Sequence, residues 1–197
     1  GVIYYLYKAY DNLSKNRQFE SFMDLLSAAF TAPQVVPGLG TAAGAAGKAV
    51  VKGLQKILGP IFKLFVKAKN SIGSLYQAGK ATAKGSKFAT KITKIMTKNS
   101  DKLGKLNPVL ETAAKYANKL KDFIKGKKDT LKPVFDRLGF SADDAVKTIE
   151  KGTGAIDDAA KMTKSAAAGK IDDVVESTLD IGAKINVFGP DDAAKLK

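Results

Sequence analysis

The 197-residue chain contains no cysteine, no histidine and no tryptophan. Without cysteine it has no disulfide, no thiol nucleophile and no thiolate metal ligand. Without histidine it has no imidazole base that would work near neutral pH. Arginine is scarce too, since Arg17 and Arg137 are the only two. These absences exclude most zinc sites and most cysteine- or histidine-based catalysis.

The remaining polar residues do not form a recognisable catalytic or cofactor motif. A glycosidase needs two carboxylates on either side of a sugar cleft, and nothing in the sequence marks such a pair. The segment Gly38-Leu39-Gly40 lacks the Gly-Lys-Ser/Thr continuation of a phosphate-binding P-loop. The aspartate pairs of the C-terminal third lack the spacing of a calcium-binding EF-hand loop. We therefore predict that the chain is not an enzyme and binds no metal or other cofactor.

The net charge of +14 is concentrated in the middle of the chain. Residues 1–47 have a net charge of 0, residues 48–132 of +17 and residues 133–197 of −3. The three segments also differ in pattern. The first is an apolar helix with a Pro/Gly/Ala-rich hairpin, the second a set of lysine-rich amphipathic helices, and the third a tail of short helices. Such charge asymmetry gives information on binding partners rather than on the fold.

Apolar residues recur at steps of three and four through most of the chain, which predicts amphipathic helices. Alternating β-branched residues are scarce, so strands are not expected. We predict one helix over residues 1–30, a helix over residues 48–69 that bends at Gly59–Pro60, and a helix that begins at Asn107–Pro108. The fold class is therefore all-α, an extended or loosely bundled array of helices with Pro/Gly joints.

A regular lysine pattern runs through residues 75–105. Eight lysines follow one another at steps of three or four, which places them on one stripe of a long helix. No acidic residue lies between Lys48 and Asp101, so no lysine within that interval has a local partner four residues away. We expect the stripe to face an acidic surface on a partner protein. Its members are Lys80, Lys84, Lys87, Lys91, Lys94, Lys98, Lys102 and Lys105.

The lysine stripe is also compatible with loose binding of nucleic acid, because lysines can neutralise phosphates. However, residues 48–132 contain 21 lysines and no arginine. Base readout and bidentate phosphate contacts favour arginine. Nonspecific association with a polyanion therefore stays open as an alternative, whereas sequence-specific binding is not expected.

Residues 25–47 carry no charge, and this run is long enough to span a membrane. Pro33 and Pro37 interrupt the run, and its small residues allow close helix–helix contact. The cationic amphipathic segment 48–69 that follows is typical of helices on anionic membrane surfaces. Two interpretations therefore remain, a tight helix packing or an insertion into a membrane. The residues concerned are Gly40, Gly44, Gly47, Ile57, Ile61, Phe62 and Phe65.

An Asp-Asp pair recurs four times in the last third of the chain. Ser, Gly or Pro precedes each pair within three residues, and in the first turn of a helix carboxylates interact favourably with the helix dipole. We therefore predict one short helix per pair, with glycines near the joints. The pairs are 143/144, 157/158, 172/173 and 191/192, and the glycines are Gly152, Gly154, Gly169 and Gly182.

The run Pro-Gly-Leu-Gly-Thr-Ala-Ala-Gly-Ala-Ala-Gly at 37–47 resembles the small-residue hairpins that precede toxin modules in bacterial polymorphic toxins. The Lys/Ala/Gly helices, with Ile-Asp-Asp-Ala-Ala-Lys and Ile-Asp-Asp-Val-Val-Glu within 156–176, are similar to the linkers of those proteins. They are also similar to parts of phage tail tape-measure proteins and other virion proteins of injection particles. The resemblance is compositional and spans roughly residues 33–180.

The resemblance implies a non-enzymatic helical part of a long modular protein. Such a part is built into a virion or carried by a secreted or injected particle, and in a toxin it would reach a target membrane. Because the chain opens at Gly1 without an initiator methionine, we expect a fragment or a processed product. The leading functional hypothesis is a structural segment that packs on partner subunits through its apolar faces. The first alternative is a membrane-active translocation segment.

Overall fold

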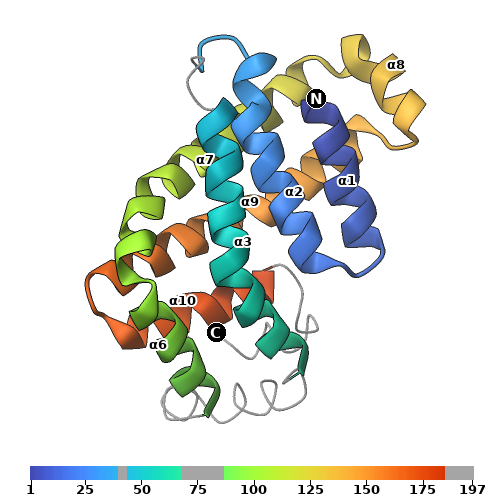
Figure 1. The fold of residues 1–197 in the computed structure, drawn as a ribbon. Coiled ribbons are helices and arrows are strands. Elements are labelled where there is room, and N and C mark those ends of the chain that lie inside the picture. Colours follow the sequence, from blue (N-terminus) through green and yellow to red (C-terminus); the bar gives the residue numbers. More distant parts are fainter. Residues whose placement is uncertain (40–43, 68–86, 185–197) are drawn as a thin grey trace.

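The computed structural model describes residues 1–39, 44–67 and 87–184. Every regular element in these ranges is a helix, with eight α-helices and one short 3₁₀ helix. The predicted all-α class is confirmed, and the helices form a loosely packed array (Figure 1).

Residues 1–30 contribute to a helical hairpin rather than to the single predicted helix. Helix α1 (Val2–Ser14) and helix α2 (Gln18–Thr31) are separated by a short turn. Asn16 in this turn has a φ of 58°. This is a left-handed conformation that asparagine tolerates better than most residues. The hairpin is joined by a buried hydrogen bond of 2.7 Å from Ser21 Oγ to the carbonyl of Ala9.

A 3₁₀ helix, η1 (Ala32–Gln34), follows α2, and the next helix is α3 (Gly44–Lys67). The helix predicted from residue 48 thus begins four residues earlier and continues through Pro60. Helix α3 packs on α2, and Gly47 lies at their contact. A Cβ atom on Gly47 would lie 2.8 Å from Phe30 Cβ, so only glycine allows this close approach.

The stripe region 75–105 was predicted to lie on one helix, but its described part divides between α6 (Lys87–Lys98) and α7 (Ser100–Gly126). Asn99 causes the break. Its side-chain amide donates a 2.7 Å hydrogen bond to the carbonyl of Ile95, which the backbone N–H of residue 99 would bond in a continuing helix. That N–H instead bonds the carbonyl of Met96, so the last turn of α6 tightens and ends.

The predicted helix start at Asn107–Pro108 is wrong, because both residues lie inside α7. Pro108 removes the donor for the carbonyl of Gly104, and the helix nevertheless continues through it. Asn107 does not act as a cap. Its side-chain amide donates a 2.6 Å hydrogen bond to the carbonyl of Ala160, which ties α7 to helix α9.

Helix α8 (Lys128–Leu138) ends at Gly139. Gly139 has a φ of 82° and provides the left-handed C-terminal cap. The next helix, α9 (Ala142–Ala167), begins with a capping box. Ser141 Oγ accepts a hydrogen bond from the N–H of Asp144, and the Asp144 carboxylate accepts one from the N–H of Ser141.

Two of the four Asp-Asp pairs lie where they were predicted, in first helical turns. Pair 143/144 opens α9, and pair 172/173 opens helix α10 (Ile171–Lys184). Pair 157/158 contradicts the prediction, because it lies in the middle of α9 together with Gly152 and Gly154. Gly169, with a φ of 73°, does form a joint between α9 and α10. Pair 191/192 lies outside the described residues.

Tertiary packing explains why the two glycines inside α9 do not end the helix. A Cβ atom on Gly152 would overlap Leu25 Cδ2 of α2, so glycine is required where these helices cross. A Cβ atom on Gly154 would lie 3.1 Å from Lys184 Cδ, and Lys184 Nζ reaches to 2.7 Å from Asp158 Oδ2. These glycines therefore allow close contacts of α9 with α2 and α10.

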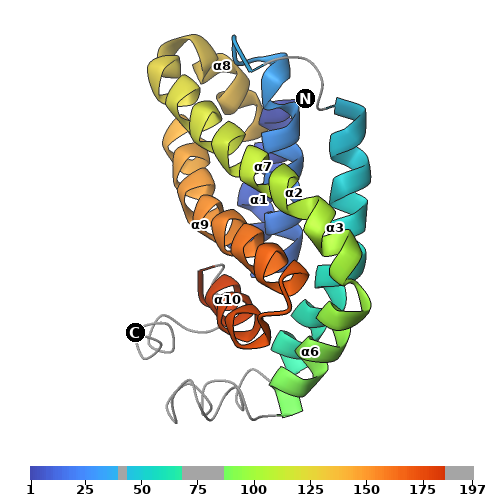
Figure 2. The same cartoon turned by 90° about the vertical axis from the view of Figure 1, so that its left-hand side faces the viewer.

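Helices α7 and α9 form the central pair of the fold, and α8 connects them (Figure 2). The α1–α2 hairpin packs on this pair, α3 lies against α2, and α10 packs on α9 and contacts α6. One continuous hydrophobic core takes buried residues from each of the three charge-defined segments. The core includes Leu26 of α2, Ile61 of α3 and Ile156 of α9.

Candidate functional site: the lysine face of α6 and α7

Six of the eight lysines of the predicted stripe are described, and all six are exposed. We call them the lysine face. They are Lys87, Lys91, Lys94 and Lys98 of α6 and Lys102 and Lys105 of α7. Lys80 and Lys84 lie outside the described residues.

Buried apolar residues of the same helices fix the direction of the lysine face. Ala89, Ile92 and Met96 of α6 are each 2% exposed or less, and Leu103 of α7 is fully buried. These residues anchor one side of each helix in the core. Since lysines at steps of three and four occupy the opposite side, they point to solvent. The fold therefore positions the lysine face through the core side chains beneath it.

The lysine face has no carboxylate partner among the described residues. Asp101 precedes Lys105 by four residues, yet no ion pair joins these two described side chains. Lysines further along the chain differ, because each of three meets an acid. The distance from the lysine Nζ to a carboxylate oxygen is 3.6 Å for Lys125 and Glu150, 2.6 Å for Lys128 and Asp143, and 3.0 Å for Lys132 and Asp136.

Like charges three or four residues apart on a helix repel one another, so the lysine face slightly destabilises its own helices. A negatively charged surface would relieve this repulsion. Each ammonium group is a compact charge with three donors, and it contacts a carboxylate or phosphate through single bonds rather than as a planar fork. The chemical capacity of the lysine face is therefore electrostatic binding.

The second group of predicted residues lies in the helix core. Ile57, Ile61 and Phe62 of α3 are between 0% and 4% exposed, and Gly47 is buried against Phe30. Their side chains are used for packing within the fold. Gly44 is the first residue of α3. Gly40 and the side chain of Phe65 lie outside the described part of the structure.

No helix in the described part of the chain combines the length and apolarity that a membrane crossing requires. The charge-free run 25–47 divides between the end of α2, the 3₁₀ helix and the beginning of α3. Within the described residues, no three acidic side chains converge in a way that could hold a metal ion.

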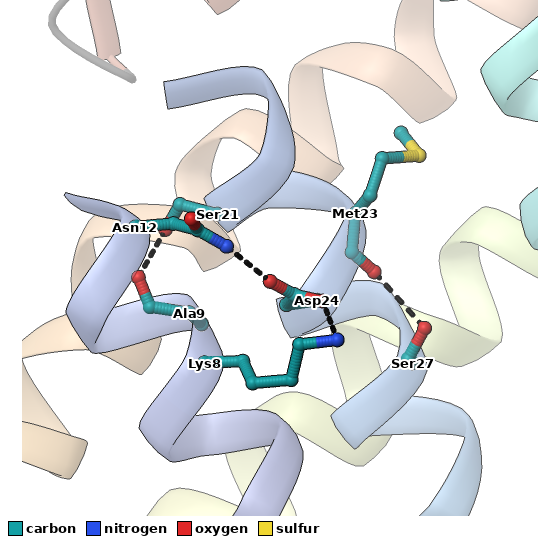
Figure 3. Close-up of polar contacts among 7 residues, drawn as sticks. All are labelled: Lys8, Ala9, Asn12, Ser21, Met23, Asp24 and Ser27. Atoms are coloured by element: carbon teal, nitrogen blue, oxygen red, sulfur yellow. Dashed lines mark hydrogen bonds and ion pairs between the residues drawn. The ribbon is translucent and has the colours of Figure 1, made fainter. Parts of the chain in front are cut away.

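The structure also contains a polar site that the sequence did not indicate, at Asp24 of α2 (Figure 3). Its side chain is 15% exposed. Asn12 of α1 donates a 2.7 Å hydrogen bond to Asp24 Oδ2, and Lys8 Nζ lies 3.8 Å from Oδ1. Burial raises the pKa of Asp24, while the hydrogen bond from Asn12 and the charge of Lys8 partly oppose this increase.

The raised pKa of Asp24 predicts a pH-dependent effect of Asp24→Asn. In the unfolded chain the carboxylate ionises near its ordinary pKa of 3.8, and in the folded chain it ionises at higher pH. The folded state thus binds more protons in this window, and stability falls as pH rises through it. Asparagine does not ionise and still accepts the bond from Asn12. We expect the melting temperature of Asp24→Asn, relative to wild type, to be higher at about pH 7 than at about pH 3.5.

Asp11→Asn is the matched control, because Asp11 is on the neighbouring helix and forms a partly exposed pair with Lys15. It should cost less than about 0.5 kcal/mol of stability, with no gain at neutral pH. If Asp24→Asn instead lost stability on going from acid to neutral pH, then the contacts with Lys8 and Asn12 would outweigh the effect of burial.

Comparison with protein-family models, curated proteins and solved structures gives no match. The chemistry of the exposed surface is therefore the guide to function.

Proposed function

We propose that this chain is a non-enzymatic helical structural segment of a large protein associated with a phage virion or another injection particle. Its lysine face binds an acidic surface on a partner subunit. The observation that supports this proposal is a row of six exposed lysines without carboxylate partners among the described residues. The compositional resemblance to virion and toxin-delivery proteins supplies the context.

Two features favour an acidic protein over nucleic acid as the partner. The lysine face contains no arginine, which is the preferred residue for phosphate forks and base edges. Single-strand binders also need exposed aromatic side chains for base stacking. The exposed large apolar side chains of the described residues are Tyr4, Val35 and Val134, and none of them lies on α6 or α7.

The apolar faces that were expected to contact partner subunits are mostly used within the fold. The core cluster includes Leu54, Ile57 and Ile61 of α3 and Ile92 of α6. The contact with a partner must then depend on charge. Individual exposed ion pairs contribute only about 0–1 kcal/mol, so binding has to be collective. It should weaken steeply as salt shortens the screening length.

The experiment compares two triple variants that each remove three positive charges. Lys91, Lys94 and Lys98 are changed to Gln in the first, and Lys125, Lys128 and Lys132 in the second. Glutamine is a good helix former, so circular dichroism should show unchanged helicity. Poly-L-glutamate, which has no apolar side chains, serves as the acidic probe. We expect the first variant to bind at least about tenfold more weakly than wild type at low salt.

The second triple variant should weaken binding by no more than about threefold, since its lysines already have acidic partners. An equal loss in both variants would mean that only net charge matters, which would overturn the proposal. Binding to a DNA duplex that is much tighter than to poly-L-glutamate would favour the nucleic-acid alternative. Affinity that does not change between about 0.05 and 1 M salt would exclude an electrostatic contact.

A further inference from the structure

A large groove lies between α1, α2 and α3, in a part of the chain that does not include the lysine face. Helix α2 lies between α1 and α3 (Figure 1), and both neighbours pack against it. The groove encloses about 1120 Å³. Phe19, Met23 and Ser27 of α2 form its floor, at steps of four residues along one stripe of the helix.

The dimensions of the groove match a helix better than a small molecule. Its α1 wall extends from Tyr5 to Asn12 and continues into the turn at Asn16, and its α3 wall extends from Val51 to Lys63. The α3 wall corresponds to about 18 Å, or three helical turns. Pockets for small ligands usually measure about 300–1,000 Å³, so this volume lies above their range. A floor helix with a wall helix on each side is the geometry in which an amphipathic helix binds.

The floor of the groove carries apolar side chains. The ring of Phe19 lies 4.6 Å from the ring of Phe62, which comes from α3. Met23 provides an adaptable side chain that suits contact with varied apolar partners. Ser27 has a small side chain. Its hydroxyl donates a 3.1 Å hydrogen bond to the carbonyl of Met23 (Figure 3). A bound helix would thus place apolar side chains along one stripe against this floor.

The rim of the groove carries more positive than negative charge. The Asp24 carboxylate already accepts a hydrogen bond from Asn12 and pairs with Lys8 (Figure 3). Arg17, Lys56 and Lys63 also line the groove, are exposed, and form no ion pair with any described acidic side chain. Glu20 is the other acidic residue that lines it. Charge complementarity then requires negative side chains on the flanks of the occupant.

We propose that this groove binds an amphipathic α-helix of a partner protein, at least three turns long, with an apolar stripe and acidic flanks. The apolar stripe contacts the floor of α2, and the acidic flanks contact Arg17, Lys56 and Lys63. This site is separate from the lysine face in sequence and in chemistry, because it combines apolar contact with charge. It gives the chain a second and more selective contact with its assembly.

The test uses fluorescein-labelled helical peptides of about 15 residues, or four turns. Four acidic peptides carry glutamate flanks and an apolar stripe of Leu, Ile, Met or Phe, and each has a twin with lysine flanks. Fluorescence anisotropy measures binding to the full chain. We expect at least one acidic peptide to bind at least about tenfold more tightly than its lysine twin. If no acidic peptide bound at about 1 mM, a very weak affinity, the proposal would be wrong.

Variants locate the binding site. Ser27→Arg fills the groove, and the double change Lys56→Glu with Lys63→Glu reverses the rim charge at two exposed positions. Each should reduce affinity for the best acidic peptide by at least about tenfold. The lysine-face variant, with Lys91, Lys94 and Lys98 changed to Gln, should change it by less than about threefold. Circular dichroism checks that each variant is folded. If Ser27→Arg does not fold, the double rim variant still tests whether the peptide binds in the groove.

Three outcomes would overturn the proposal. A loss of affinity in the lysine-face variant that equals the loss in the groove variants would assign the peptides to the lysine face. Groove variants that bind like wild type would show that the groove is not used. Oleate that binds at one molecule per chain and displaces the peptide would indicate an anionic amphiphile as the occupant. Failure of poly-L-glutamate to bind the lysine face leaves this test unaffected, so the two proposals fail separately.

Discussion

Replacing Ile61 with aspartate should lower the free energy of unfolding by at least about 4 kcal/mol, or abolish cooperative folding. Ile61 of α3 is fully buried within the hydrophobic core. A carboxylate there would lose its hydration without gaining an ion-pair partner, which is among the most costly changes in a protein interior. Chemical denaturation followed by circular dichroism measures the effect.

Two control variants distinguish the aspartate charge from general sensitivity of α3. Ile61→Val removes one buried methyl group and should cost about 0.5–1.5 kcal/mol. Lys52→Asp places the same carboxylate at an exposed position of α3, where the change should stay within about 0.5 kcal/mol. A folded and stable Ile61→Asp protein would mean that this apolar face is not core. The membrane-active interpretation of residues 48–69 would then regain support.

Replacing Gly152 with alanine should destabilise the protein by about 3 kcal/mol, at the upper end of the usual cost of overpacking. The added Cβ atom would overlap Leu25 Cδ2 at the crossing of α9 and α2. Leu25 is buried and surrounded by other atoms, so its side chain cannot move away without displacing neighbours. We expect a lower denaturant midpoint with an unchanged dependence on denaturant concentration.

Gly53→Ala in α3 is the opposite case and serves as the control. A Cβ atom at Gly53 would have no atom within 4 Å, and the residue lies inside a helix. Alanine is better than glycine in a helix interior by about 0.5–1 kcal/mol, so this variant should be more stable than wild type. If Gly152→Ala were as stable as Gly53→Ala, then α2 and α9 would not cross as closely as the structure shows.

The all-α class followed from the sequence because apolar spacing records which side of each helix is buried. The helix boundaries were less predictable, as four residues show. Helices end near Asn16 and Asn99, although the spacing of apolar residues predicted that they would continue. Pro108 and Gly152 lie inside helices that local rules would interrupt. Glycine is required at position 152 because Leu25 fills the space that a Cβ atom would take. The residues next to Gly152 in the sequence do not indicate this contact.

The two candidate sites also differ in how far local sequence determines them. Exposure of the lysine face was predictable, because lysines and buried apolar residues alternate along the same helices. The groove at Asp24 was not, because it requires knowing that residues 1–30 fold back as a hairpin. Asn12 and Asp24 meet only when α1 and α2 lie side by side. The available sign was the charge of Asp24 among the apolar residues of segment 22–30.

The contact between Gly152 and Leu25 also affects how the chain matures during synthesis. Leu25 is synthesised first, and most of the chain separates it from Gly152. The ribosome therefore needs on the order of 10 s after Leu25 to reach Gly152. During that interval the α1–α2 hairpin has no α9 to cover Leu25. A nascent chain that stalled before α9 would carry this apolar surface uncovered and would become a substrate for chaperones or proteases.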